Sequence, residues 1–256
     1  MTYARTMLGG IAVATLALVA PATSAAILTL DSITRVNSGT TTVDLTNTGT
    51  TDWAYWSTTG TGLASPVVPN NEKLGGTAIS GASNVGGTTL RGSASSATTL
   101  RYSYTGDGTS PTSAAGVNAN GLLFNSDLGT SAVNKGVSVT LAGDTAVTRT
   151  ANLYFGGFAA TGVLTLTLNG ATTIVDAPQV FANSSPKGMA VFVISYRPDN
   201  VSDVLTASWV ATAVTDVTFS HVGIQAVTVQ VPEPGTLAVV GVAALGLGRR
   251  RRHAGR

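Results

Sequence analysis

A strong β-hairpin signal in the second half of the chain limits the folds that this sequence can adopt. The stretch from residue 162 to 177, GVLTLTLNGATTIVDA, alternates apolar and polar residues on both sides of Asn169-Gly170. Alternation with a period of two places apolar side chains on one face of a strand. Asn-Gly favours the tight turn that joins two antiparallel strands. The stretch therefore predicts two paired strands, each with one buried face.

Further runs with a period of two extend this pattern over residues 26–230. We count about ten to twelve short strands and no convincing amphipathic helix, which predicts an all-β, jelly-roll-like antiparallel sandwich. Residues 64–98 are rich in Gly, Ser, Thr and Asn and predict either a long surface loop or weak edge strands. The other clear runs are TTVDLTN (41–47), GVSVTLAG (136–143), AVFVISYRP (190–198), VLTASWV (204–210) and HVGIQAVTVQV (221–231).

Composition supports a β fold and excludes several classes of function. Charged residues make up only 10% of the chain, whereas Thr occurs 40 times and Gly 30 times, which favours strands and turns over helices. Residues 27–230 hold ten Asp and one Glu against three Lys and five Arg, a net charge of −3. Residues 27–230, which we call the middle of the chain, therefore lack the basic face that a nucleic-acid partner requires. The sequence contains no Cys, which excludes disulfides and thiol catalysis.

The N-terminus, residues 1–25, has the pattern of a signal peptide. Arg5 and the α-amino group precede an apolar run over residues 7–20, which a proline ends and small residues follow. This order predicts export through the inner membrane and cleavage after Ala25 or Ala26. The alternative is a buried N-terminal helix, although the segment shows no amphipathic pattern.

The C-terminal segment, residues 231–256, combines an apolar run with a basic end. Residues 235–248 carry no charge, and a helix of this length spans about 21 Å, less than the ~30 Å hydrocarbon core. Three effects can compensate for this short length. A cluster of positive charges stays on the cytoplasmic side of the membrane, the aliphatic stems of arginines let their charged ends reach the interface, and the bilayer can become thinner around the helix. We therefore predict a C-terminal transmembrane helix, with a helix packed on the domain as the alternative. Its predicted cytoplasmic anchor is Arg249, Arg250, Arg251 and Arg252.

The order of features in this tail is specific. Pro232, Glu233 and Pro234 precede the apolar run, and the arginine cluster follows it close to the C-terminus. This order resembles the PEP-CTERM sorting signal of Gram-negative bacteria. The resemblance implies that an exosortase-type membrane transpeptidase is the processing partner. It also implies a chain that is exported, transiently anchored in the membrane and then delivered to the cell envelope or the extracellular space.

Four segments of the middle follow one another in a recognisable order. They are VDLTNTGTTDWAYW (43–56), YTGDGTSPTSAAGVNANG (104–121), ANLYFGGFAATGVLTLTLNGA (151–171) and VISYRPDNVSDVLTASWV (193–210). Their order resembles a secreted bacterial β-sandwich module with a galactose-binding-like fold, often found beside polysaccharide-active or cell-surface proteins. The chain departs from that module at Tyr55, where the module often has His, and it lacks the Gly expected after Trp56.

The middle offers few groups for catalysis. His221 is its only His and Glu72 its only Glu, so a Glu pair for glycoside hydrolysis is excluded, although pairs of Asp remain open. No G-x-S-x-G, H-E-x-x-H or P-loop pattern occurs. We therefore expect neither enzyme activity nor a cofactor or metal. Asp107, in the Gly-rich segment TGDGTSP, fits a solvated turn better than a calcium site.

Three aromatic residues in TDWAYW form the one candidate ligand site. In a strand, Trp53 and Tyr55 share a face and Trp56 points to the other. Exposed rings can stack on sugar rings, whereas buried rings belong to the core, which is the favoured interpretation. Two hypotheses follow for the whole chain: a structural or adhesive protein of the cell envelope or extracellular matrix, or a carbohydrate-binding module that contacts exopolysaccharide.

Overall fold

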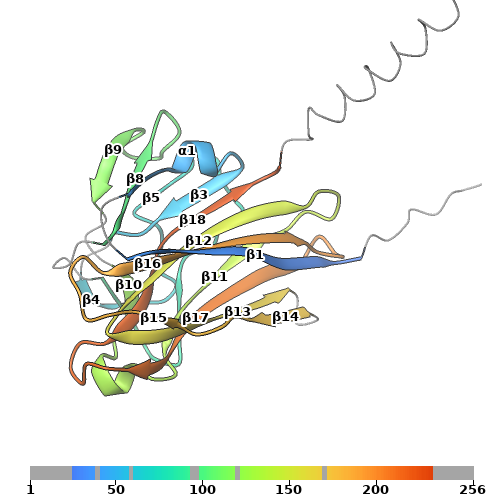
Figure 1. The fold of residues 1–256 in the computed structure, drawn as a ribbon. Coiled ribbons are helices and arrows are strands. Elements are labelled where there is room, and N and C mark those ends of the chain that lie inside the picture. The colour runs from blue at the N-terminus through green and yellow to red at the C-terminus, as the bar shows by residue number, and fades with distance from the viewer. Residues whose placement is uncertain are drawn as a thin grey trace, which may run out of the picture.

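The regular secondary structure in the described part of the chain is almost entirely β. The computed structural model describes residues 25–37, 41–57, 60–92, 98–118, 122–168 and 172–232. Within these ranges, helix is limited to α1 (Leu45–Thr48) and a 3-10 turn, η1 (Gly129–Ala132). Long strands stack in layers behind one another (Figure 1). The prediction of an all-β sandwich is confirmed.

Eight strands form the sandwich as one antiparallel ribbon that is folded back on itself. They are β10 (Leu123–Asn125), β11 (Gly136–Ala142), β12 (Arg149–Phe158), β13 (Ala160–Leu168), β14 (Thr172–Val175), β16 (Gly188–Arg197), β17 (Val204–Val214) and β18 (His221–Gln230). Outward from the hairpin, β13 pairs with β14, β12 with β16, β11 with β17 and β10 with β18. Winding this ribbon places β10, β18, β12 and β16 in one sheet and β11, β17, β13 and β14 in the other. This arrangement is that of a jelly roll.

The tip of the ribbon coincides with the strongest turn signal in the sequence. Leu168 pairs with Thr172, and the ladder continues to Thr165 and Val175. Asn169 and Gly170 lie outside the described residues, but the strands on either side of them pair as the sequence predicts. The local Asn-Gly signal thus marks the midpoint about which the whole ribbon folds.

Ten further strands widen the sheets and add a third layer. They are β1 (Ile27–Val36), β2 (Thr41–Asp44), β3 (Asp52–Tyr55), β4 (Gly60–Leu63), β5 (Asn71–Glu72), β6 (Ser83–Val85), β7 (Leu90–Gly92), β8 (Leu100–Tyr104), β9 (Ala114–Asn118) and β15 (Gln179–Val180). β1 forms one edge of the larger sheet beside β16, and β7 and β4 extend it beyond β10. β3 pairs with β18, whereas β2, β8 and β9 form a separate three-stranded sheet.

Two apolar clusters hold these layers together. The main cluster lies between the sheets of the jelly roll and includes Trp209, Phe155 and Phe192, all fully buried. The second cluster lies on the outer face of the larger sheet, where Trp53 of β3 packs against Tyr104 of β8 and Tyr55 against Tyr102. β18 is therefore covered on both faces, and nine of its ten residues are buried.

Two local expectations are resolved by the structure. Residues 64–98, where described, contribute three short strands: β5 and β6 lie at sheet edges, and β7 lies next to the edge strand β4, so the alternative of weak strands near sheet edges holds there. The TTVDLTN run is not a continuous strand, because the chain turns into α1 after Asp44. The Asp44 carboxylate accepts a hydrogen bond from the backbone N of Asn47 at 3.1 Å and caps that turn. Local capping thus overrides the alternation of Val43 and Leu45.

Both predicted targeting segments extend beyond the part of the chain that the structure describes, which runs from Ala25 to Pro232 with internal gaps. None of the helices within that part has the length and hydropathy needed to cross a bilayer. The signal peptide, the helix over residues 235–248 and the anchor Arg249–Arg252 stay predictions.

Candidate functional site

The last strand of the fold runs directly into the Pro-Glu-Pro sequence. β18 pairs with β12 along one side, from His221 to Gln230, and with β3 and β10 along the other. Val231 follows this strand and is 37% exposed, and Pro232 is exposed as well. A single residue therefore separates the central strand of the larger sheet from the first proline of the motif. Glu233 and Pro234 lie outside the described residues.

The N-terminal end of the domain lies on the same side of the fold as its C-terminal end. Thr29 of β1 pairs with Ser195, Ser195 with Thr150, and Thr150 with Gln230. Three strand spacings separate β1 from β18 along this row, or about 14 Å. Figure 1 shows the start of β1 and the end of β18 both at the right of the molecule. The predicted signal peptide and the predicted anchor thus join the domain at one end.

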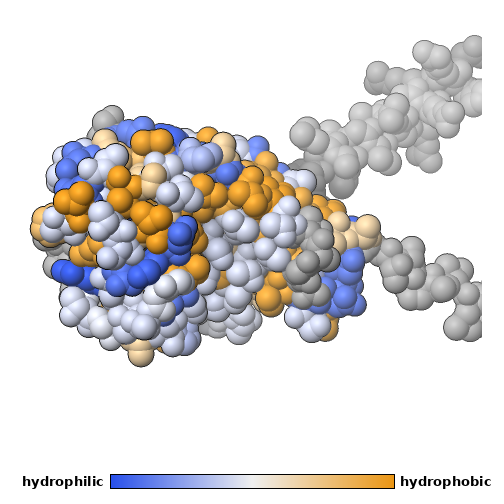
Figure 2. Space-filling model, turned by 90° about the horizontal axis from the view of Figure 1, so that it is seen from below, coloured by the Kyte–Doolittle hydropathy of each residue, from blue (hydrophilic) through white to orange (hydrophobic). Residues whose placement is uncertain are grey.

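We call this end the terminal face and define it by Ala25, residues 143–148, residues 198–203, Val231 and Pro232. Its two loops touch, because Gly143 lies against the ring of Pro198. Side chains tie the strand ends of this face together: an Nη of Arg149, at the start of β12, donates to the carbonyl oxygen of Ala142, at the end of β11, at 2.8 Å, and an Nη of Arg197, at the end of β16, donates to that of Ala25, before β1, at 3.0 Å. In Figure 2 this end lies at the right and shows both apolar and hydrophilic residues.

The predicted sugar-contact residues are not available for stacking. Trp53 and Trp56 are fully buried, and Tyr55 is only 3% exposed. As the alternation predicts, Trp53 and Tyr55 lie in the second cluster, whereas Trp56 lies in the main core. The three-stranded sheet covers the outer face of β3, a layer that the local sequence does not reveal. In this fold the three rings therefore pack in the core, which is the interpretation that the sequence favours, and none of them is exposed for stacking on a sugar.

Asp107 lies in a partly buried polar cluster rather than in a fully solvated turn, and its side chain is 21% exposed. Its carboxylate accepts hydrogen bonds from the Thr46 hydroxyl at 2.7 Å, the Trp53 indole at 3.1 Å and Lys73 Nζ at 2.8 Å. Partial burial raises the pKa of Asp107, but these three donors outweigh it and hold the pKa below its usual value. No group of three or more His, Asp or Glu within the described ranges could hold a metal. The cluster joins α1, β3 and the loop before β9.

A second polar pair lies deeper in the fold: the sequence marks His221 as the only His of residues 27–230 but does not reveal its partner, Lys187. Lys187 is 2% exposed, and its Nζ donates to Nε2 of His221 over 2.9 Å, while Nδ1 of His221 donates to the carbonyl oxygen of Phe219 at 2.6 Å. The His221 ring stacks on Phe124 with 3.9 Å between ring centroids. Burial lowers the pKa of Lys187 to about 8 and that of His221 to about 3, and the neighbouring cations, including Arg91, add to both effects.

This pair should make the domain less stable in acid. In the unfolded chain the pKa of His221 returns to about 6.5, so the unfolded state binds a proton that the folded state excludes between pH 6.5 and 3. The contribution of His221 to stability is therefore fully present above pH 6.5 and is lost progressively towards pH 3. At about 1.4 kcal/mol per pKa unit, we expect a loss of roughly 3 kcal/mol on moving from pH 7 to pH 4. Urea unfolding of residues 26–230 at pH 7 and at pH 4 measures this loss of unfolding free energy.

The matched control is His221→Gln, which keeps an acceptor for Lys187 but does not titrate. Its unfolding free energy should fall clearly less between pH 7 and pH 4 than that of the wild type. Equal losses in the two proteins would show that other groups, such as the carboxylates, set the acid sensitivity.

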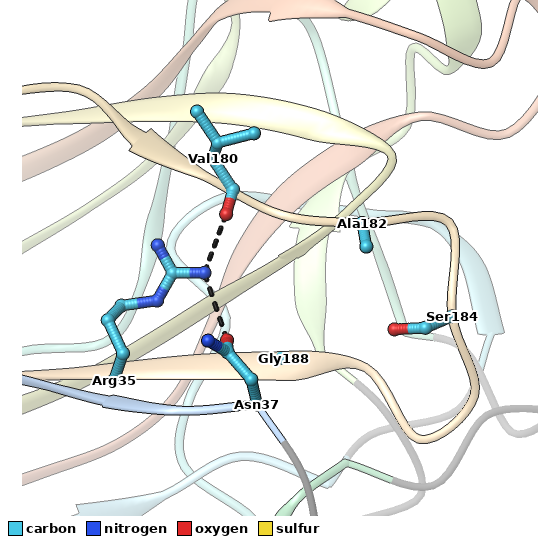
Figure 3. Close-up of a pocket in the computed structure, with 6 residues that line it drawn as sticks. All are labelled: Arg35, Asn37, Val180, Ala182, Ser184 and Gly188. Atoms are coloured by element: carbon cyan, nitrogen blue, oxygen red, sulfur yellow. Dashed lines mark hydrogen bonds between the residues drawn. The ribbon is translucent and has the colours of Figure 1, made fainter.

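A small cavity lies between the ends of β1 and β15 (Figure 3). Its volume is about 190 Å³, and its lining residues are Arg35, Asn37, Val180, Ala182, Ser184 and Gly188. Arg35 Nη2 donates to the carbonyl oxygen of Val180 at 2.6 Å and to Oδ1 of Asn37 at 3.0 Å, and its guanidinium lies 4.2 Å above the Phe181 ring. Ligand pockets usually measure about 300–1,000 Å³. The guanidinium thus ties β15 to β1, and the cavity is small for a sugar chain.

Comparison with known proteins identifies the tail. Residues 230–252 match the family model for the PEP-CTERM protein-sorting motif, so the match begins at the last residue of β18 and ends at Arg252. The predicted resemblance of the tail is confirmed. The motif indicates sorting by an exosortase-type system, which makes this chain an exported protein that is processed at the membrane. No curated protein and no solved structure matches the chain, and the resemblance of the middle to a galactose-binding-like module stays a prediction.

Proposed function

We propose that the chain is a structural or adhesive protein that an exosortase-type system delivers to the cell envelope or the extracellular matrix. The observation that carries this proposal is the direct junction between β18 and the matched motif. The sorted product is then a stable jelly roll with no spacer between its central strand and the processed segment. In this proposal residues 235–248 anchor the chain in the membrane until processing.

The chemistry of the described residues supports a structural role over an enzymatic one. The polar groups that stand out are engaged within the fold: Asp107 holds three donors, His221 is paired with Lys187, and Arg35 bonds to backbone and side-chain oxygens. A catalytic group needs access to a substrate. The aromatic side chains that would favour the carbohydrate-binding alternative are buried in the core.

Affinity electrophoresis separates the two binding hypotheses. Residues 26–230 should migrate equally in gels with and without the exopolysaccharide of the producing cells, because no aromatic platform of β3 is exposed. An antibody to the domain should detect the processed protein in the envelope or matrix fraction. Retardation that depends on polysaccharide concentration would support the carbohydrate-binding module instead, and recovery of all the protein inside the cell would contradict both hypotheses.

A further inference from the structure

We propose that the terminal face is a membrane-contact surface, which lies on the lipid headgroups while the tail anchors the chain. This proposal rests on the anchor in the proposed function. Its basis is that the start of β1 and the end of β18 lie on one face, and that the connection between Gln230 and the predicted helix is short. The partner is the lipid surface itself.

The connection is too short to hold the domain away from the bilayer. Five residue steps separate Gln230 from Gly235, where the predicted helix begins, and fully extended they span at most about 18 Å. The headgroup region on each side of a bilayer takes up roughly 5–8 Å of that span. The end of β18 thus stays within about 10–13 Å of the headgroups. A domain of about 200 residues is about 40 Å wide, so it cannot avoid the surface.

The two chain ends also fix which part of the domain meets the membrane. Before signal-peptide removal, both ends connect to membrane segments, and the two connections lie about 14 Å apart on the terminal face. Two attachments to one face oppose tilting of the domain. The prolines of the motif favour an extended connection, so β18 points towards the bilayer.

The exposed side chains of the terminal face suit shallow contact with lipid. Val201 is 85% exposed at the tip of the β16–β17 connection, and Val147, on the β11–β12 connection, and Val231 are each 37% exposed. The charged side chains of this end and its adjoining strand ends are nearly balanced, with three Asp and two Arg: Asp144, Asp199, Asp203, Arg149 and Arg197. Contact therefore depends on the tether and the valines rather than on attraction to anionic lipids.

The opposite end of the domain provides a matched reference position. Val217, in the connection between β17 and β18, is 74% exposed and lies beyond the other end of β18. A ten-residue strand separates the two ends by about 33 Å. Because the sequence contains no Cys, Val201→Cys and Val217→Cys each create a unique labelling site on an exposed loop.

The test uses the exported form, residues 26–256, reconstituted in phosphatidylcholine vesicles with an environment-sensitive fluorophore on either cysteine. Flotation with the vesicles is measured first. We expect the Val201→Cys probe to show blue-shifted emission and several-fold stronger quenching by spin-labelled lipids than the Val217→Cys probe. A Gly-Ser insertion of 12 residues between Gln230 and Val231 should remove most of this difference, because it lengthens the tether.

The outcomes separate this proposal from the anchor on which it rests. If both proteins float but their probes are equally exposed to water, or Val217→Cys is quenched more strongly, the orientation is wrong while the anchor stands. If neither protein floats, the anchor fails and the orientation fails with it. An unchanged difference after the Gly-Ser insertion would show that the short tether does not hold the face on the membrane.

Discussion

Replacing Pro232, Glu233 and Pro234 by alanine should leave the full-length protein in the membrane fraction. The matched motif indicates sorting by an exosortase-type system, and we expect its prolines to favour an extended chain at the site of processing. Alanine favours helix at all three positions, so the extended segment is lost while the apolar run is unchanged. Membrane fractionation with an antibody to the domain, together with the mass of the product, measures processing.

Val231→Ala is the matched control, because it changes the neighbouring exposed residue outside the Pro-Glu-Pro sequence. We expect this variant to be processed like the wild type. If the triple alanine variant is also processed and localised normally, the motif is not the processed segment and the tail acts only as an anchor.

Substituting the four arginines tests the other half of the tail. Moving one arginine through the bilayer centre costs about 2.5–3.5 kcal/mol on insertion scales, so Arg249–Arg252 should hold the end of the chain in the cytoplasm. With Ser or Asn at these positions, we expect the tail to pass through and unprocessed protein to be released. The two sets of variants therefore accumulate unprocessed protein in different fractions.

Trp209→Ala should lower the unfolding free energy of the domain by about 3–5 kcal/mol. The Trp209 ring stacks on Phe155 at 5.5 Å between centroids and meets Phe192 and Phe181 edge-on at 5.4 and 5.9 Å. Its indole nitrogen donates to the carbonyl oxygen of Gly156 at 3.0 Å. Replacing a buried Trp by Ala usually costs about 3–5 kcal/mol, out of a typical total of about 5–15 kcal/mol. Urea unfolding of residues 26–230, followed by far-UV circular dichroism, measures the loss.

Two further variants serve as comparisons for the loss of stability in Trp209→Ala. Trp209→Phe keeps an aromatic ring but loses the hydrogen bond to Gly156, so it should cost clearly less than Trp209→Ala. Val217→Ala, on an exposed loop, should unfold at the same urea concentration as the wild type. If Trp209→Ala also unfolds there, the contacts between the two sheets do not centre on this residue.

The matched sorting motif lies in the last 27 residues, yet the structure of the strand that precedes it depends on the whole domain. The sequence alone identifies the motif, because Pro-Glu-Pro, an apolar run and arginines follow one another within one short segment. What it does not reveal is that β18, immediately before the motif, is the central strand of the larger sheet. That position depends on pairing with β12, whose residues lie about 70 positions earlier in the chain.

Local patterns therefore indicated the long strands, the pairing of the two strands that flank Asn169-Gly170 and the sorting tail, because alternation, turn chemistry and motif order are properties of neighbouring residues. The tertiary structure alone decided which faces are buried and which distant groups meet. It covers Trp53 and Tyr55 with a third layer and brings Lys187 against His221. It also gives Asp107 its three hydrogen-bond donors and places the start of β1 and the end of β18 on one face. These outcomes depend on how sheets stack and which strands become neighbours, and contacts between residues far apart in the chain leave no periodic signal in the sequence.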